Sequence, residues 1–171
     1  MKSESSSTDS VQNQNPTKWW ATAVATFFGI GYLKPGPGTW ASVAAVLLWA
    51  AFAFALHPST LTLTLALALG IVVAVAVGVP AATIVERQSG RADPGFVVID
   101  EVIGQWIALL FCPPNWPHAL IALILFRLFD ITKPFPIRRI ERLPAGSGIV
   151  FDDVGAGLYA LVVATLVRIW F

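Results

Sequence analysis

The chain has 171 residues, of which 56% are hydrophobic and 12% are charged, and its formal net charge is +1. Its mean hydropathy of +0.72 lies well outside the range of soluble globular domains, so a very apolar soluble bundle is the less favoured interpretation. The small net charge provides no global field for nucleic acid. Cys112 is the only cysteine, which leaves no disulfide framework and no thiolate metal spacing, and we interpret it as a small buried residue.

Residues 1–18 are polar and rich in serine, without the apolar core of a signal peptide or a membrane span. We expect a disordered tail here, followed by one membrane domain over residues 19–171. Trp19 and Trp20 begin an apolar stretch that predicts a short helix at the membrane interface, where tryptophan is favoured.

Two uncharged stretches, residues 40–56 and 61–82, predict membrane-spanning helices joined by an HPST turn, because about 20 apolar residues cross a bilayer. Residues 96–111 and 118–129 predict a second helical hairpin around the CPPNWP turn. A last helix is expected over residues 154–171. The expected fold is therefore an all-α, polytopic membrane bundle of about five to seven helices.

The charged side chains are expected at one end of this bundle. If the HPST and CPPNWP turns share one face, that face carries only His57 and His118 as titratable groups, and every charged loop falls on the other face. The positive-inside rule makes this other face cytoplasmic. Its cations are Lys18, Lys34, Arg87, Arg91, Lys133, Arg138, Arg139 and Arg142. Arg168 is the exception, and we interpret it as a snorkelling residue at the far interface.

A turn rich in glycine and proline runs from Lys34 to Thr39 and leads directly into a predicted helix. Free backbone N–H groups and the positive end of the helix dipole suit a phosphate there, and Lys34 adds a full charge. The alternative is an ordinary loop with Thr39 as the helix N-cap, and local features alone favour that alternative.

Asp100 and Glu101 open the helix predicted over residues 96–111, and Gln105 follows one turn later. Acids can simply complement a helix N-terminus, but that explains one carboxylate better than two and leaves Gln105 unexplained, so we favour a functional role. Arg127 and Asp130 are flanked by apolar residues and are expected to point into the bundle rather than form only an ion pair at the surface.

Asp152 and Asp153 stand before the last predicted helix, where one of them is expected to cap it. If the helix ends meet, these two join Asp100, Glu101 and Asp130 in an acid cluster whose repulsion a cation would offset. Magnesium is the economical choice, because it takes carboxylate ligands and bridges to phosphate.

Four cations are expected beside this cluster: Lys34, Arg127, Lys133 and Arg138. Acid-bound Mg²⁺ with nearby cations is typical of phosphoryl transfer. His57, His118 and Cys112 fall in the opposite turns, which disfavours a phosphohistidine or phosphocysteine. Attack by metal-activated water or by a carboxylate such as Asp100 remains. Topology alone accounts for Arg139 and Arg142.

The motifs GYLKPGPGTWAS, DPGFVVIDEVIGQWIAL and FRLFDITKPFPIRRIERLPAGSGIVFDDVGAGLYA together resemble the phosphatidylglycerophosphatase A family, from about residue 25 to the end. The resemblance implies an all-helical, Mg²⁺-dependent membrane phosphatase of the bacterial inner membrane. Such an enzyme converts phosphatidylglycerophosphate to phosphatidylglycerol and phosphate, in the biosynthesis of phospholipids including cardiolipin precursors. Some relatives look much less hydrophobic, so membrane embedding rests on composition.

The candidate site residues fall into three groups. Those expected in catalysis are Asp100, Glu101, Asp130 and Asp153. Those expected to bind the substrate phosphate are Lys34, Thr39, Arg127, Lys133 and Arg138. Those expected to bind Mg²⁺ are Asp100, Glu101, Asp130, Asp152 and Asp153.

Two other functions remain as alternatives. A small transporter or channel subunit would spread polar residues through the membrane depth, whereas here they gather at one end. A scaffold protein would not explain acids and bases that recur in three separate loops. The expected partners are the phosphatidylglycerophosphate substrate and the lipid bilayer, without nucleic acid, and oligomeric state stays open.

Overall fold

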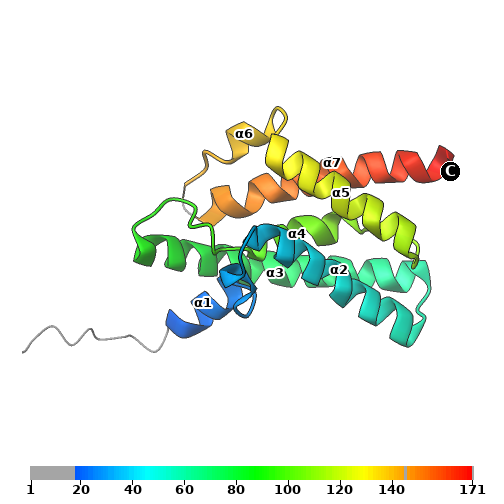
Figure 1. Cartoon of the computed structure of the whole chain (residues 1–171), viewed down its shortest axis with the longest axis horizontal. Helices are drawn as coiled ribbons and strands as arrows, with labels where there is room; N and C mark the ends of the chain where they lie inside the picture. The colour runs from blue at the N-terminus through cyan, green and yellow to red at the C-terminus, as the bar shows by residue number, and fades with distance from the viewer. Residues whose placement is uncertain (1–17, 145, 171) are drawn as a thin grey trace, which may run out of the picture.

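The computed structural model describes residues 18–144 and 146–170, and within them the chain is all-α, with seven α-helices, one 3₁₀ helix and no strand (Figure 1). The α-helices are α1 (Lys18–Ala25), α2 (Pro37–Leu56), α3 (Thr60–Ser89), α4 (Ile99–Ala108), α5 (Trp116–Thr132), α6 (Ile137–Ile140) and α7 (Gly146–Trp170). The 3₁₀ helix η1 (Ile30–Tyr32) lies between α1 and α2. The predicted all-α fold is confirmed. Residues 1–17 of the predicted tail lie outside the described residues.

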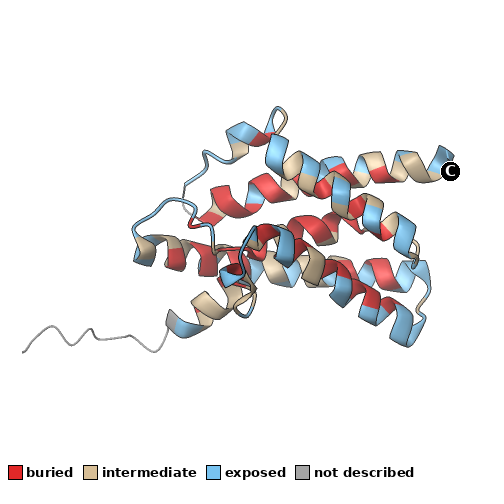
Figure 2. Cartoon of the chain, viewed as in Figure 1, coloured by how far each residue is buried: buried red, intermediate tan, exposed pale blue. Residues whose placement is uncertain are grey.

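Three of the described helices, α2, α3 and α7, are long and apolar enough to cross a membrane. The outward surface of α3 is strongly apolar, with Leu61, Leu65 and Leu69 all more than half exposed. Lipid tails are as apolar as leucine, so this surface suits a bilayer and not water. Figure 2 shows the same pattern, with buried residues between the helices and exposed residues on the outer faces.

Local signals set most of the helix boundaries. Ser59 caps α3 by accepting a hydrogen bond from Thr62 N at 3.1 Å, and Asn115 caps α5 by accepting one from His118 N at 3.1 Å. Gly90 ends α3 in the left-handed conformation. The predicted N-cap at Thr39 is wrong: α2 begins at Pro37 after Gly36, because proline fits the first helical turn, and Thr39 lies inside the helix.

The last helix starts earlier than the sequence predicts. α7 begins at Gly146, so Asp152 and Asp153 lie inside it and neither caps it. This start requires glycine at residue 146, because a side chain there would collide with the backbone of α3 at Val79 and Thr83. Gly146 N also donates to Thr83 Oγ1 at 3.2 Å, which ties the beginning of α7 to α3. Because α7 starts early, both carboxylates are part of this helix.

The central helix of the bundle is α4, which packs against α2, α3, α5 and α7, while α1 packs against α3. The α2–α3 and α4–α5 turns lie together at one end of the bundle, and the α3–α4 and α5–α7 connections lie at the other (Figure 1). The rings of Phe54 and Trp116 join the two turns, with centroids 5.6 Å apart. The Arg168 guanidinium reaches the Phe111 carbonyl at this same end, as predicted from the chain order.

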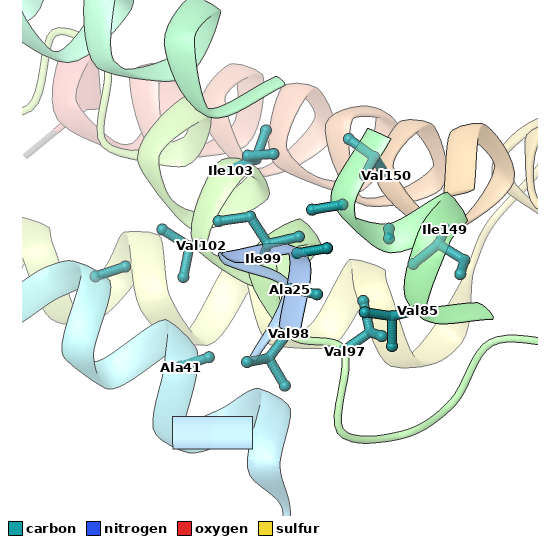
Figure 3. Close-up of a cluster of buried hydrophobic side chains, with 14 of the residues drawn as sticks. Ala25, Ala41, Val85, Val97, Val98, Ile99, Val102, Ile103, Ile149 and Val150 are labelled. Carbon is teal, nitrogen blue, oxygen red and sulfur yellow. The ribbon is translucent and has the colours of Figure 1, made fainter. Parts of the chain in front are cut away.

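The core beside the start of α4 consists of small and branched side chains, including Ala25, Ala41, Val98 and Val102, all fully buried (Figure 3). Alanine allows close helix approach in a membrane bundle. α4 and α7 cross closely, because a side chain at Gly104 would collide with the Asp153 carbonyl of α7 and with Phe126 of α5. This crossing brings the acids of α4 and α7 together.

Candidate active site

Three carboxylates meet where α4 crosses α7, and we call them the carboxylate trio: Asp100, Glu101 and Asp153. One carboxylate oxygen from each lies within 4.8 Å of the other two. Asp100 is 8% exposed and Asp153 is 2% exposed, so the trio is nearly dry. Asp100 and Glu101 stand in the first turn of α4, where the helix dipole favours negative charge.

The trio has the properties of a cation site. Asp100 Oδ1, Glu101 Oε2 and Asp153 Oδ2 are buried and have no hydrogen-bond partner. Burial raises the pKa of Asp100 well above its usual value, and the charges of Glu101 and Asp153 raise it further. Unpartnered hard oxygen atoms in a dry place fit a divalent cation, which would offset the repulsion between them.

Arg127 of α5 stands beside the trio. Its Nη1 lies 2.7 Å from Asp130 Oδ2 and 4.0 Å from Glu101 Oε1. Asp130 is in turn an electrostatic neighbour of Glu101 and Asp153. As the sequence predicts, Arg127 and Asp130 point into the bundle. Asp130 forms an ion pair at the edge of the trio, and Arg127 brings a cation next to the acids.

Asp152 faces a different partner from its neighbour Asp153. Its Oδ2 lies 2.6 Å from Lys133 Nζ, and Lys133 Nζ also lies 2.9 Å from Glu141 Oε1. Burial lowers the pKa of Lys133, but its hydrogen bonds and charge interactions with Asp152 and Glu141 outweigh burial and raise the pKa above its usual value. Lys133 is therefore a permanent cation that links α5, α6 and α7.

The N-terminal end of α2 closes one side of the trio at Gly38. A side chain at this position would collide with Glu101 Oε1, and its Cβ would lie 3.2 Å from Arg127 Nη1. Ser42, one turn later, is fully buried and donates to Gly38 O at 2.9 Å. Glycine at residue 38 thus lets the α2 backbone approach both a carboxylate and the guanidinium.

Three of the predicted phosphate-binding residues form no polar interaction with the acids. Lys34, Thr39 and Arg138 are exposed, and within residues 18–144 and 146–170 no hydrogen bond or ion pair joins them to the trio. Lys34 stands in the loop just before α2, and Arg138 Nη2 donates to the Thr132 carbonyl at 3.3 Å. The structure thus groups Asp100, Glu101, Asp130, Asp153 and Arg127, and gives Asp152 and Lys133 a neighbouring ion pair.

The sequence interpretation missed the role of Glu141, which compensates Lys133, and did not place Asp93 in the site. Asp93 is an exposed residue and an electrostatic neighbour of Lys133, Glu141 and Asp130, and partial desolvation of its carboxylate raises its pKa. Asp93 begins the motif DPGFVVIDEVIGQWIAL, which carries part of the family resemblance, and this was the available signal for it. Gln105 was singled out correctly as unusual: it is fully buried, and both atoms of its amide lack a partner.

The opposite end of the bundle holds Cys112, His57 and His118. Cys112 is buried, and burial raises the pKa of its thiol to about 11. Its thiol is neutral near neutral pH and is not a nucleophile. His118 Nδ1 lies 2.6 Å from Asn115 Oδ1 in the cap of α5. These residues form no part of the carboxylate centre.

The fold and the site together define a helical membrane protein with a buried carboxylate centre flanked by an arginine and a lysine. Residues 23–168 match the family model described as Phosphatidylglycerophosphatase A, and the chain belongs to this family.

Curated relatives match most of the chain. It is 38% identical, over 85% of its length and 91% of the relative's, to a Bacteroides thetaiotaomicron protein named "Putative phosphatidylinositol-3-phosphatase". It is 36% identical to "Phosphatidylglycerophosphatase A" of Haemophilus influenzae, covering 86% of this chain and 88% of that protein. The Escherichia coli protein of the same name is 34% identical, covering 79% of this chain and 76% of the relative. No solved structure matches the chain.

Proposed function

We propose that this protein is a Mg²⁺-dependent membrane phosphatase that hydrolyses the terminal phosphate monoester of phosphatidylglycerophosphate, giving phosphatidylglycerol and inorganic phosphate. The observation that carries the proposal is the carboxylate trio, whose unpartnered oxygens lie beside Arg127. Membership of the phosphatidylglycerophosphatase A family supports the same substrate. The product is a membrane phospholipid and a precursor of cardiolipin.

Each group in the site has a distinct task. Asp100, Glu101 and Asp153 would hold Mg²⁺, with Asp130 beside them. Bound Mg²⁺ neutralises phosphate charge and lowers the pKa of a coordinated water. Arg127 stabilises the negative charge of the phosphate, and its ion pair with Asp130 fixes the guanidinium in place. Lys34, exposed in the loop before α2, would bind the substrate phosphate only if the lipid head group extends to that loop.

Two routes for the attack on phosphorus are open to these residues. A water held at the trio can attack directly, with one of the carboxylates accepting its proton. Alternatively, a carboxylate such as Asp100 can attack phosphorus and break its bond to the glycerol oxygen, which leaves with a proton as phosphatidylglycerol, and water then hydrolyses the phosphoryl-enzyme to release phosphate. The first route is favoured, because Asp100 is buried among Glu101 and Asp153. In that position it suits a shared cation ligand better than a free nucleophile.

A lipid substrate suits the arrangement of apolar and charged surfaces. With the three candidate spans in the bilayer, the acyl chains of a lipid substrate can stay in the membrane beside them. The head group of the lipid then lies at the charged end of the bundle. By the positive-inside rule, this end faces the cytoplasm, in the inner membrane of a bacterium. The substrate's tails need not leave the lipid during turnover.

The relative named for phosphatidylinositol 3-phosphate suggests a second candidate substrate. Both lipids carry a phosphodiester and a separate phosphate monoester, so the same chemistry would serve either. The test is to incubate the purified protein with Mg²⁺ and each lipid in detergent micelles and to measure released phosphate. Faster release from phosphatidylglycerophosphate is expected. Faster release from the inositol lipid would make that lipid the substrate in place of phosphatidylglycerophosphate. No release from either lipid would favour a transport role.

A further inference from the structure

The segment between α5 and α7 encloses a cationic hollow that the chemistry above does not use. We define the cationic hollow by Lys133, Phe135, Arg138, Arg139 and Arg142, and it has a volume of about 470 Å³. Among the described residues, no carboxylate lines it. A hollow with several cations and no acid in its wall is electrostatically complementary to an anion.

The three arginines of the hollow are not compensated by neighbouring acids. Glu141 lies between Arg139 and Arg142 in the sequence, but its carboxylate is bound to Lys133. In the part of the chain that the structure describes, none of the three arginines forms an ion pair. The positive-inside rule explains the side of the membrane on which they lie, but not their position around one hollow.

The rim of the hollow is suited to a lipid. Phe135 is 69% exposed, and the Arg139 guanidinium lies 4.7 Å from the centroid of its ring. The Tyr159 hydroxyl of α7 donates to the Phe135 carbonyl at 3.0 Å, which fixes this rim against a candidate membrane span. An aromatic ring next to arginines matches the boundary between acyl chains and phosphates.

Lys133 connects the cationic hollow to the carboxylate trio. It lines the hollow, and its Nζ lies 2.6 Å from Asp152 Oδ2, next in the chain to Asp153 of the trio. A phosphate bound in the hollow would therefore lie outside the trio, joined to it through Lys133 and Asp152. One ligand with two phosphate groups could occupy both places at once.

Resting on the proposed function, we propose that the cationic hollow binds the phosphodiester phosphate of the substrate while the terminal monoester lies at the trio. Guanidinium groups donate paired hydrogen bonds to phosphate oxygens, which a lysine cannot match. In phosphatidylglycerophosphate one glycerol unit separates the two phosphates. The hollow then selects lipids with two phosphates over phosphatidate, whose only phosphate is the monoester.

The test compares phosphatidylglycerophosphate with phosphatidate of the same acyl chains in micelles of an uncharged detergent. The variant is Arg139→Gln/Arg142→Gln, and the control is Arg87→Gln/Arg91→Gln, which removes the same charge from exposed positions outside the hollow. The ratio of kcat/KM for the two lipids should fall about ten-fold or more in the variant. It should stay within about two-fold in the control.

A second measurement separates binding from folding. Phosphatidylglycerol carries the phosphodiester without the monoester, so it should inhibit the wild type, and its inhibition constant should rise about ten-fold in the variant. Arg139→Lys/Arg142→Lys keeps the charge and should restore only part of the ratio. If the Arg139→Gln/Arg142→Gln variant kept the wild-type ratio, either at full rate or after an equal loss on both lipids, the proposed subsite would be wrong and the proposed function would stand. No turnover of any lipid by the wild type would overturn the proposed function with it.

Discussion

Neutralising a buried acid of the trio and neutralising Asp130 at its edge should change the stability of the protein in opposite directions. Asp100 has like charges around it and an unpartnered oxygen, so Asp100→Asn should raise the thermal stability measured in chelator, by about 1–2 kcal/mol. Asp130 is paired with Arg127, so Asp130→Asn should lower stability by a similar amount. Thermal unfolding in detergent, with chelator and with Mg²⁺, measures both effects.

Both variants should lose most phosphatase turnover, for different reasons. Asp100→Asn should also lose the stabilisation that Mg²⁺ gives the wild type, whereas Asp130→Asn should keep most of it. If both variants kept near-normal rates, the acids would be structural. Equal stability changes in the two variants would contradict the distinction between a like-charge cluster and a compensated pair.

The Lys133–Asp152 pair should contribute to stability as a unit. Lys133→Met leaves Asp152 buried without its cation and should cost about 3 kcal/mol, while the double variant Lys133→Met/Asp152→Asn should cost clearly less than the sum of the single changes. Arg91→Met, at an exposed position, should change stability by less than about 0.5 kcal/mol. Additive single effects would show that the pair is not coupled.

The pH dependence of this pair follows from the raised pKa of Lys133. Because the folded pKa lies above the unfolded pKa, the stabilisation is complete at all pH values below the unfolded pKa and is lost only as pH rises through the folded pKa. The difference in stability between wild type and Lys133→Met should therefore be constant across neutral pH and shrink only under strongly alkaline conditions.

At the scale of elements, the start of α2 depends on Gly38. Gly38→Ala adds a methyl group that must displace Glu101 or the α2 backbone, and it should lower kcat/KM by about ten-fold or more while the far-UV circular dichroism stays unchanged. Gly95→Ala is the matched control, because a Cβ added at Gly95 would meet no atom within 4 Å. An active Gly38→Ala variant would show that α2 does not constrain Glu101.

The sequence predicts the hairpins better than it predicts the helix starts. Long uncharged stretches identify α2 and α3, and the proline-rich turn separates α4 from α5, because these signals are local. The start of α7 could not be predicted in this way. Gly146 and Gly148 are typical of a loop, and only their close packing against neighbouring backbone shows that they belong to a helix. Because α7 starts at Gly146, the cap expected from one of these two acids is absent, and both Asp152 and Asp153 are buried inside the helix.

The candidate site shows the same limit for single residues. Asp100, Glu101 and Arg127 could be identified from polar residues in apolar surroundings, since buried charge has few structural explanations. The sequence could not predict that Asp152 pairs with Lys133 while Asp153 joins the trio. Adjacent residues on a helix point in directions about 100° apart, and the sequence does not say what each one meets. Lys133 was predicted to bind phosphate, and the structure pairs it with Asp152 and Glu141.

At the scale of the whole molecule, the HPST turn and the charged loops lie at opposite ends of the bundle, and the proposed orientation puts these ends on opposite sides of the membrane. In a Cys112→Ala background, Thr60→Cys should react with an impermeant maleimide in intact cells, and Gln88→Cys only after permeabilisation. Both residues are exposed, so the two positions differ in side and not in burial. Labelling of both positions in intact cells would contradict the proposed orientation.

The central claim is that the carboxylate trio makes lipid phosphate hydrolysis depend on a divalent cation. Its most direct test is the rate of phosphate release from phosphatidylglycerophosphate by purified wild type and Asp100→Asn, measured as free Mg²⁺ is raised from chelated to millimolar levels. The wild type should be inactive in chelator and reach full rate with Mg²⁺, while Asp100→Asn should stay at least about a hundred-fold slower throughout. Wild-type turnover that persists in chelator would contradict the account.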